Sequence, residues 1–255
     1  MNRKPKVAFF DFAGCEGDQL QVVNLEEKLL ELLSLVDVVS FREAVSEHSD
    51  NYDIAFVEGS ITRKSDEERL KKIRENAKIL VAFGSCATTG GINCLKNTWP
   101  SLEEVKKTVY KDKAYLFETY PSRGIDRVVK VDFYIPGCPI HREEFLEVVK
   151  ALVMGVKPKL PNYPVCVECK RNGNICVFET GGFCLGPVTR AGCNSRCVNA
   201  GSHCWGCRGL VDDPNVNAEK EVLAKYGLTV NDVLSLFNLY NNYRCREIQD
   251  EKDNS

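Results

Sequence analysis

The sequence predicts an α/β protein, in which a parallel β-sheet covered by helices is followed by a small irregular region rich in cysteine. Short, almost wholly apolar segments alternate with helical patterns in the first part of the chain, which is typical of a sheet buried on both faces. Eight of the thirteen cysteines then fall between positions 166 and 207. A chain of 255 residues can hold one full domain and a smaller one. We place these two domains over residues 1–160 and 161–255.

The expected strands and helices follow one another along the first domain. Apolar runs predict strands over 6–12, 36–41, 53–57, 78–83 and 131–135. Apolar residues at helical spacing and charged surface patterns predict helices over 18–35, 64–76 and 143–154. Because helices separate the strands, we expect the strands to lie parallel.

The second domain has no comparable periodicity. Three prolines within residues 157–164 interrupt the pattern, and residues 166–207 contain many glycines among the eight cysteines. Such a stretch cannot bury enough apolar side chain to fold alone, so bound metal is the natural source of its stability. Helices are expected again over 218–225 and 230–240, before a polar end.

Three cysteines of the first domain share one topological position. Cys15, Cys86 and Cys138 each follow the carboxyl end of an expected strand, on a turn that contains glycine. Those ends converge at one edge of an open α/β sheet, where ligands bind. Asp18 lies three residues after Cys15, and a carboxylate can bind iron, although thiolate suits iron better. We predict one cluster held by Cys15, Asp18, Cys86 and Cys138; Asp18 as a simple helix N-cap, or one cysteine as buried core, are the alternatives.

The cysteines of the second domain divide into two sets of four. The first is Cys166, Cys169, Cys176 and Cys184, and the second is Cys193, Cys197, Cys204 and Cys207. Thiols in the cytosol stay reduced, so metal binding is favoured over disulfides. Four cysteines bind zinc as well as they bind an iron–sulfur cluster. The glycine and apolar residues between them favour the larger cluster.

Several other candidates receive no function. Cys94 and Cys245 lie outside the three sets. Glu16 and Glu58 are expected at the same sheet edge as exposed carboxylates, with proton movement or a subunit contact as the alternative. The three histidines, His48, His141 and His203, are expected to be structural side chains.

Composition excludes some classes of protein. The net charge of −2, with 44% hydrophobic and 27% charged residues, is unlike the basic domains that bind nucleic acid. No run approaches the roughly 20 apolar residues of a membrane span, and the basic start has no signal-like apolar stretch. We therefore expect a cytoplasmic protein without a nucleic-acid or membrane partner.

Taken together, these motifs resemble the small subunit of [NiFe]-hydrogenases, over nearly the whole chain. That family has a Cys-x-x-Cys after the first strand, a Gly-x-Cys after a middle strand and a Gly-Cys-Pro after a later one. Residues 15–18, 84–86 and 136–139 stand at these positions. The run Cys184-Leu-Gly-Pro-Val-Thr, then Cys193, then Cys204-Trp-Gly-Cys207, is similar to the later motifs of the family.

The resemblance implies a flavodoxin-like first domain and three [4Fe-4S] clusters. The proximal cluster would be held by Cys15, Asp18, Cys86 and Cys138, the medial by Cys193, Cys197, Cys204 and Cys207, and the distal by Cys166, Cys169, Cys176 and Cys184. The chain would relay electrons and contain no catalytic residue of its own. A large subunit would carry the nickel–iron site. Diaphorase-type subunits with flavin and further clusters would use NADP(H) or sulfur.

Three departures from the periplasmic enzymes point to a cytosolic branch. Asp18 replaces the second proximal cysteine, as in some cytosolic members, and we expect it to alter the potential of that cluster. Cys197 allows a complete medial cluster, and Cys166 stands where the periplasmic enzymes use histidine. Within the cytosolic branch the chain is most similar to the delta subunits of archaeal sulfhydrogenases.

Three other interpretations remain open from the sequence. A quinone-reductase or complex I-type small subunit shares the first domain but usually lacks the eight later cysteines. Another hydrogenase branch could pass electrons to a deazaflavin or heterodisulfide acceptor. The interpretation from a different class is a non-redox interaction protein stabilised by zinc.

Overall fold

The computed structural model describes residues 3–212, together with 221, 224–227, 229, 232 and 235–241. The chain divides into two compact units, residues 1–158 and 159–255. We call them the sheet unit and the cysteine-rich unit, and describe each by itself. Within the described residues, no helix combines the length and the apolar character needed to cross a membrane.

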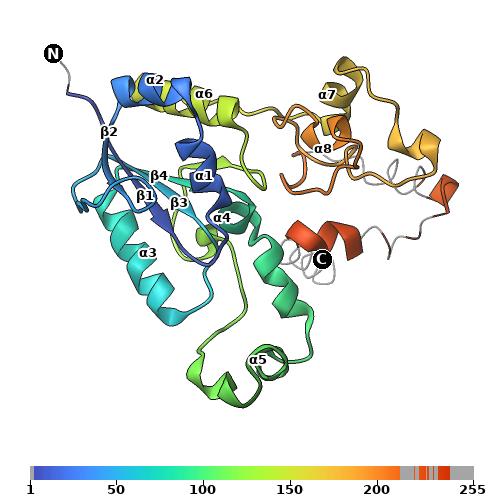
Figure 1. Cartoon of the computed structure of the whole chain (residues 1–255), viewed down its shortest axis with the longest axis horizontal. Coiled ribbons are helices and arrows are strands. Elements are labelled where there is room, and N and C mark those ends of the chain that lie inside the picture. The colour runs from blue at the N-terminus through green and yellow to red at the C-terminus, as the bar shows by residue number, and fades with distance from the viewer. Residues whose placement is uncertain are drawn as a thin grey trace, which may run out of the picture. The chain divides into compact units, whose positions relative to one another are not determined.

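A five-stranded parallel sheet forms the centre of the sheet unit (Figure 1). Its strands are β1 (Lys6–Asp11), β2 (Asp37–Phe41), β3 (Ile54–Glu58), β4 (Ile79–Phe83) and β5 (Phe133–Ile135). Their order in space is β2-β1-β3-β4-β5, which is the flavodoxin-like order, with its switch point between β1 and β3. The predicted fold class is confirmed. All five predicted strands form, although β5 is shorter than expected.

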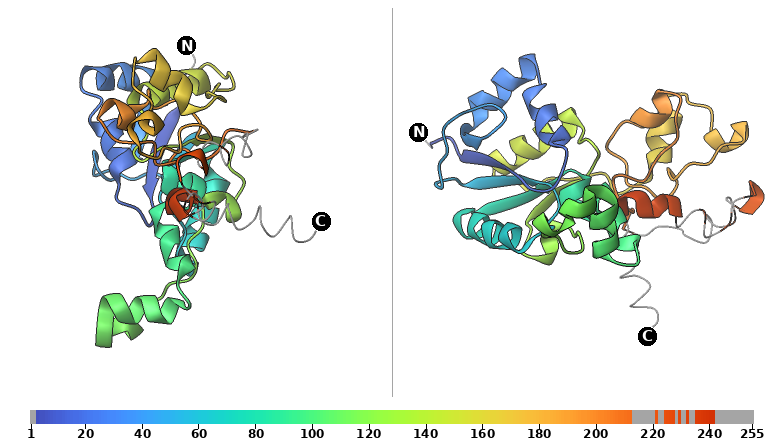
Figure 2. Two further views of the ribbon diagram at one scale, coloured as in Figure 1. Left: turned by 90° about the vertical axis from the view of Figure 1, so that its right-hand side faces the viewer. Right: turned by 60° about the horizontal axis from the view of Figure 1, so that its bottom comes forward.

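The two faces of the sheet bury different side chains, because successive residues of a strand point to opposite faces. On one face the rings of Phe9, Phe56 and Phe83 pack around Phe145 of α6 (Arg142–Val153). On the other face, small strand residues pack against the apolar side of α3 (Lys64–Asn76); this cluster includes Ala8, Ala55, Ala82, Leu70 and Ile73. Figures 1 and 2 show α3 on one side of the sheet and α6, with α2 beside it, on the other.

The single helix predicted over 18–35 is wrong. The structure has two helices, α1 (Gly17–Val23) and α2 (Glu27–Leu35). Between them Glu26 adopts a φ of 57°, which no helix can continue through. Leu25 is buried at this turn. Burial of Leu25 is consistent with tertiary packing overriding the apolar helical pattern.

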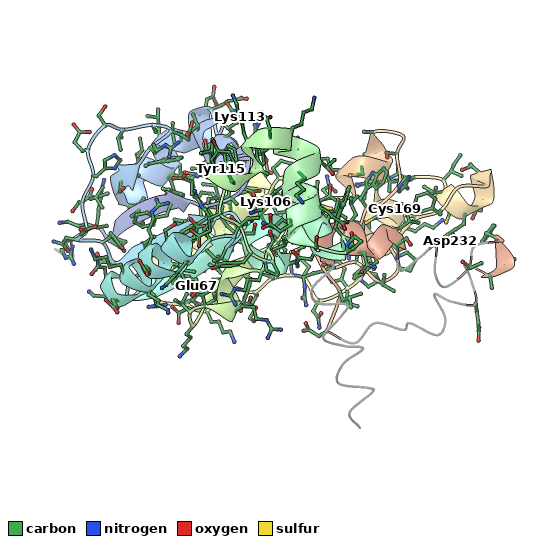
Figure 3. The ribbon with its side chains drawn as sticks, turned by 90° about the horizontal axis from the view of Figure 1, so that it is seen from below. Glu67, Lys106, Lys113, Tyr115, Cys169 and Asp232 are labelled. Carbon is green, nitrogen blue, oxygen red and sulfur yellow. The ribbon has the colours of Figure 1, made fainter. Side chains whose placement is uncertain are left out.

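An arm of short helices joins β4 to β5, where the sequence analysis placed no element. It comprises α4 (Ser85–Thr89), η1 (Ile92–Thr98), α5 (Leu102–Tyr110), η2 (Lys111–Leu116) and η3 (Ile125–Arg127). Helix α5 buries none of its residues. The ring of Tyr110 stacks on that of Phe117 at 3.9 Å, and Tyr115 is 81% exposed (Figure 3).

In the part of the cysteine-rich unit that the structure describes up to residue 212, the elements are short. These are α7 (Val165–Arg171), η4 (Val177–Thr180) and α8 (Arg196–Asn199). Its buried apolar groups are small: one contains Val165, Phe178, Cys184 and Cys204, and another Leu185, Val188 and Phe237. Most of the helix predicted over 218–225 lies outside the described residues, as does Cys245. Of the helix predicted over 230–240, residues 232 and 235–240 are described and are helical.

Candidate metal centres

The first candidate centre lies at the carboxyl edge of the sheet. Cys15 follows β1, Cys86 lies in α4 just after β4, and Cys138 follows β5. Burial raises the pKa of the Cys86 thiol, and the nearby charges of Asp18, Cys138 and Cys15 raise it further. All four predicted residues are therefore close enough to interact electrostatically at one site.

Backbone hydrogen bonds connect the loops that carry these residues. The N–H groups of Gly84 and Ser85 donate to the carbonyls of Ile135 and Gly137, at 2.8 and 2.6 Å. The loop after β4 is thereby fixed to the loop after β5. In the same way, Ala13 and Ser60 exchange two N–H···O bonds between the loops after β1 and β3. The spacing of the ligand loops is therefore set by the parallel sheet.

Asp18 is buried beneath this edge. It is the second residue of α1, and Glu16 holds the N-cap position, so the N-cap interpretation of Asp18 is wrong. Its side chain accepts a hydrogen bond from the N–H of Ile140 at 2.7 Å, and the residue is 5% exposed. A Cβ added to Gly84 would lie 1.7 Å from the Asp18 carboxylate. Only glycine at position 84 leaves room for this carboxylate.

Glu58 is a functional candidate that the sequence analysis misjudged. It was expected to be exposed, yet it is 2% exposed at the end of β3. Its carboxylate accepts from the N–H groups of Asp18 at 3.3 Å and Gln19 at 2.9 Å, and so positions the start of α1. Burial raises the pKa of Asp18 to about 8, with a further contribution from the negative charge of Glu58. The signal in the sequence that could have indicated burial of Glu58 was its position at the carboxyl end of a central strand.

Asn93 also belongs to this site, although no sequence motif indicated it. Its side-chain amide donates to the carbonyl of Ala13 at 2.6 Å and lies 3.8 Å from the sulfur of Cys86. It thus connects η1 with the loops after β1 and β4. Hydrogen bonds to ligand sulfurs are one means by which proteins adjust cluster potentials.

The second candidate centre lies in the cysteine-rich unit. Cys166, Cys169, Cys176 and Cys184 all line one pocket, whose other walls are mainly apolar. A Cβ added to Gly186 would lie 3.3 Å from the sulfurs of both Cys166 and Cys184. The sulfur of Cys184 also accepts from the N–H groups of Gly186 at 3.4 Å and Cys204 at 3.3 Å. The structure therefore brings this predicted set together around a cavity.

The remaining set is less fully assembled in the structure. The charges of Cys204 and Cys207 interact, and Cys193 packs in the same apolar cluster as Cys204. Cys197 lies in α8, four residues after Cys193. Among the described residues, no three His, Cys, Asp or Glu side chains converge tightly enough to hold a single metal ion.

These donors fit the cofactor that the sequence predicts. Thiolates are the ligands that iron–sulfur clusters use, and the twelve described cysteines are free of disulfides. Glycine stands where a side chain would crowd a sulfur: besides Gly186, a Cβ on Gly91 would lie 2.9 Å from the sulfur of Cys86. The one hard donor is the Asp18 carboxylate.

The cysteine and histidines without a predicted function occupy structural positions. Cys94 is fully buried, and its thiol donates to the carbonyl of Ser122 at 3.2 Å. His48 is exposed beside Ser40, and His141 pairs with Glu143. The ring of His203 lies between those of Phe183 and Trp205.

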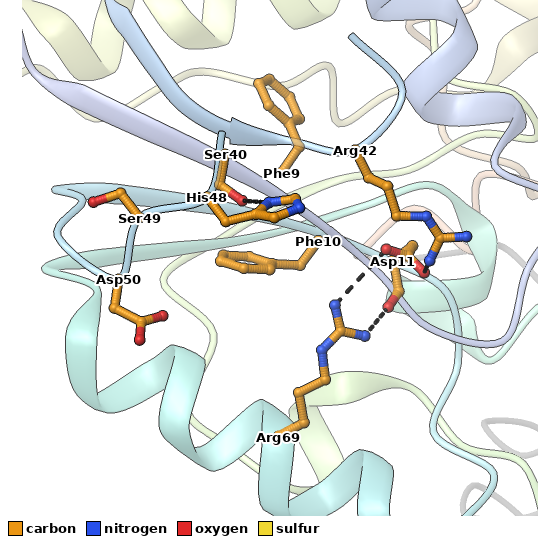
Figure 4. Close-up of a pocket in the computed structure, with 9 residues that line it drawn as sticks. All are labelled: Phe9, Phe10, Asp11, Ser40, Arg42, His48, Ser49, Asp50 and Arg69. Atoms are coloured by element: carbon orange, nitrogen blue, oxygen red, sulfur yellow. Dashed lines mark hydrogen bonds and ion pairs between the residues drawn. The ribbon is translucent and has the colours of Figure 1, made fainter. Parts of the chain in front are cut away.

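A separate pocket opens beside the ends of β1 and β2 (Figure 4). Asp11 lines this pocket and pairs with both Arg42 and Arg69. His48 and Asp50 come from the loop before β3. Carboxylates therefore already pair with both arginines of this pocket, and Arg42 has a second such partner in Glu16 at 3.8 Å.

A flavodoxin-like sheet with thiols at its ligand edge, followed by a unit with eight clustered cysteines, defines an iron–sulfur electron-transfer subunit. The sequence profile of the family described as NADH ubiquinone oxidoreductase, 20 Kd subunit, matches residues 15–152. The chain belongs to this family and, within it, to the small subunits of [NiFe]-hydrogenases. The predicted class of protein is thereby confirmed, and a redox role is favoured over the zinc-stabilised interaction protein.

Relatives of known name cover most of the chain. Sulfhydrogenase 2 subunit delta of Pyrococcus furiosus is 36% identical, over 86% of this chain and 92% of its own length. A subunit of the F420-non-reducing hydrogenase vhu of Methanocaldococcus jannaschii is 34% identical, over 92% of this chain and 94% of its own length. Among solved structures, an NAD+-reducing [NiFe]-hydrogenase in the H2-reduced state matches with a TM-score of 0.56 and 27% identity, covering 62% of this chain and 96% of that one.

Proposed function

We propose that this chain carries three [4Fe-4S] clusters and relays electrons within a cytoplasmic [NiFe]-hydrogenase. The observation that carries the proposal is the pocket lined by Cys166, Cys169, Cys176 and Cys184, which assembles a complete four-thiol set. These residues would hold the distal cluster. The medial set would be Cys193, Cys197, Cys204 and Cys207, and the proximal set Cys15, Asp18, Cys86 and Cys138. Bound clusters supply one-electron chemistry.

The residues of this chain would hold each cluster and adjust its environment. At the sheet edge, the N–H of Ile140 keeps the Asp18 carboxylate oriented, and Glu58 fixes the helix start that carries it. Cys15 and Cys138 are exposed there, so this edge of the sheet unit is open to the large catalytic subunit. In the cysteine-rich unit, N–H groups directed at Cys184 favour its thiolate.

The acceptor is proposed from the relatives. The likeness to a sulfhydrogenase delta subunit favours electron exchange with a flavin- and NADP(H)-dependent or sulfur-reducing subunit. The comparable likeness to a subunit of an F420-non-reducing hydrogenase supports a second branch. Because F420 is a deazaflavin, that name favours the heterodisulfide-linked acceptor over the deazaflavin-linked one. Hydrogen-dependent reduction of NADP+, polysulfide or a heterodisulfide by the purified complex separates the two. Turnover with NADP+ or polysulfide supports the first branch, and turnover with the heterodisulfide alone supports the second.

The cluster content is tested by iron, acid-labile sulfide and zinc analysis of the anaerobically purified protein. We expect about twelve iron and twelve sulfide per chain, the sum for three four-iron clusters. Cys169→Ser should lower the iron content by up to about four. Cys94→Ser is the matched control, because Cys94 is fully buried and its thiol donates to the carbonyl of Ser122, and it should leave iron unchanged. About two zinc and no sulfide would overturn the proposal.

A further inference from the structure

A carboxylate from another segment accepts two hydrogen bonds from the loop that carries Cys193. Glu168 lies in α7 between Cys166 and Cys169. Its two carboxylate oxygens accept from the N–H of Gly192 at 2.8 Å and from the N–H of Ser195 at 3.1 Å. These two donors flank Cys193, so the negative charge of Glu168 is held against this cysteine.

The guanidinium of Arg208 holds the same loop at residues 190 and 191, just before Cys193. Arg208 directly follows Cys207 and is 2% exposed. Its Nε donates to the carbonyl of Ala191 at 2.9 Å and approaches that of Arg190 at 3.2 Å. A positive charge and a negative charge are therefore both fixed within two residues of Cys193.

We propose that Glu168 and Arg208 are positioning residues that set, with opposite sign, the reduction potential of the cluster held by Cys193 and Cys207. The inference rests on the proposed function, because it concerns the cluster assigned to this set. One-electron reduction, for example by dithionite, adds a negative charge to the cluster. Glu168 opposes that addition and Arg208 favours it. Because Arg208 is buried and Glu168 partly buried, solvent screens these interactions less than it would at the surface.

The electrostatics of Cys193 agree with this assignment. Burial raises the pKa of its thiol, the charge of Arg208 lowers it, and the charge of Glu168 raises it. The N–H of Ser195 also lowers this pKa. Because the Glu168 carboxylate is held at Gly192 and Ser195 on either side of Cys193, loss of its negative charge should raise the potential.

The test is a redox titration of the anaerobically purified complex, followed by electron paramagnetic resonance. The medial signal is identified beforehand as the one altered in Cys197→Ala. Glu168→Gln keeps the side-chain shape and should raise its midpoint potential, whereas Arg208→Gln should lower it. Each shift should change the ratio of reduced to oxidised cluster about tenfold at a fixed potential, or about 59 mV for one electron. Arg208→Lys keeps the charge and should restore most of the potential.

Glu179→Gln is the matched control. It removes the same charge from an exposed position on η4, and it should leave the medial potential unchanged. Shifts of opposite sign in Glu168→Gln and Arg208→Gln, with full iron content, support the proposal. Unmoved potentials, or shifts of the same sign, overturn it while leaving the proposed function intact. Wild-type protein without iron and sulfide overturns both. If one variant loses its cluster, the other variant and Arg208→Lys decide.

Discussion

The two units of this protein are stabilised in different ways. In the sheet unit, strands β3 and β4 are buried almost end to end, and four phenylalanine rings interlock between the sheet and α6. In the cysteine-rich unit, the two apolar clusters found among the described residues contain four and three buried residues, and two of these are Cys184 and Cys204 themselves. The first unit has a core that does not depend on its ligands. In the second, the candidate ligands form part of the core.

The same difference governs how each site is assembled. The ligands of the sheet unit come from segments far apart in the sequence, and only the parallel strands bring them to one edge. The ligands of the cysteine-rich unit are neighbours in sequence and need only short turns to meet. A loss of metal should therefore leave the first site close to its bound geometry and dismantle the second.

Iron removal should separate the behaviour of the two units most clearly. We expect chelation of iron from the anaerobic protein to abolish amide protection across residues 165–211, while β1, β3 and β4 stay protected. Binding of structural zinc contributes about 10–16 kcal/mol in zinc-finger peptides, and the apolar clusters described in the cysteine-rich unit are too small to replace such a contribution. Hydrogen exchange with mass spectrometry measures this. Unchanged protection across residues 165–211 would show that the side chains of the cysteine-rich unit stabilise its fold without iron.

Phe145→Ala tests the opposite claim, that the sheet unit depends on its core. Phe145 is fully buried against three strand phenylalanines. The substitution should cost about 3–5 kcal/mol in the free energy of unfolding of this unit, with iron in the cysteine-rich unit retained. Urea unfolding monitored by hydrogen exchange provides the value. Tyr115→Ala, at an exposed position, should change it by less than about 0.5 kcal/mol.

Asp18 tests the sheet unit in a second way, through pH. Its pKa in the folded, iron-free chain is about 8, against the ordinary value of 3.8 for an aspartate. The folded state therefore binds the extra proton, and stability should fall as pH rises from about 4 to 8, by at most about 1.4 kcal/mol per pH unit. Asp18→Asn should remove this slope in urea titrations of the iron-free chain. In the iron-loaded protein a ligating Asp18 is ionised throughout, so a slope that persists there would argue against ligation.

The smallest expected effect comes from Cys94, a cysteine that belongs to the core of the sheet unit. Cys94→Ala removes a buried sulfur and its bond to the carbonyl of Ser122. It should lower the stability of the unit by about 1–2 kcal/mol without loss of iron. Cys86→Ala, by contrast, should lose iron from the sheet edge. Iron analysis of the two variants side by side shows whether Cys94 is a core residue and Cys86 a cluster ligand.

Local sequence patterns predicted correctly the elements whose conformation depends mainly on their own residues. Helix α3 begins and ends where its charged pattern predicts, at residues 64 and 76. The helix predicted over 18–35 failed because Leu25 is buried at a break that the apolar spacing does not reveal. Glu58 was misjudged for a similar reason: a carboxylate looks exposed in sequence until the start of α1 is seen to cover it.

The class of this protein could be determined from local sequence patterns. Apolar strands alternating with helices specify a buried parallel sheet, and the spacing of the later cysteines specifies two sets of four. Both signals are carried by residues near one another in the chain. Two arrangements came from the tertiary structure alone. The first is the position of the Asp18 carboxylate beside Gly84 and Ile140. The second is the set of hydrogen bonds from Glu168 and Arg208 to the loop of Cys193. These contacts join segments that no short-range pattern connects, because they depend on how strand ends and loops meet in space.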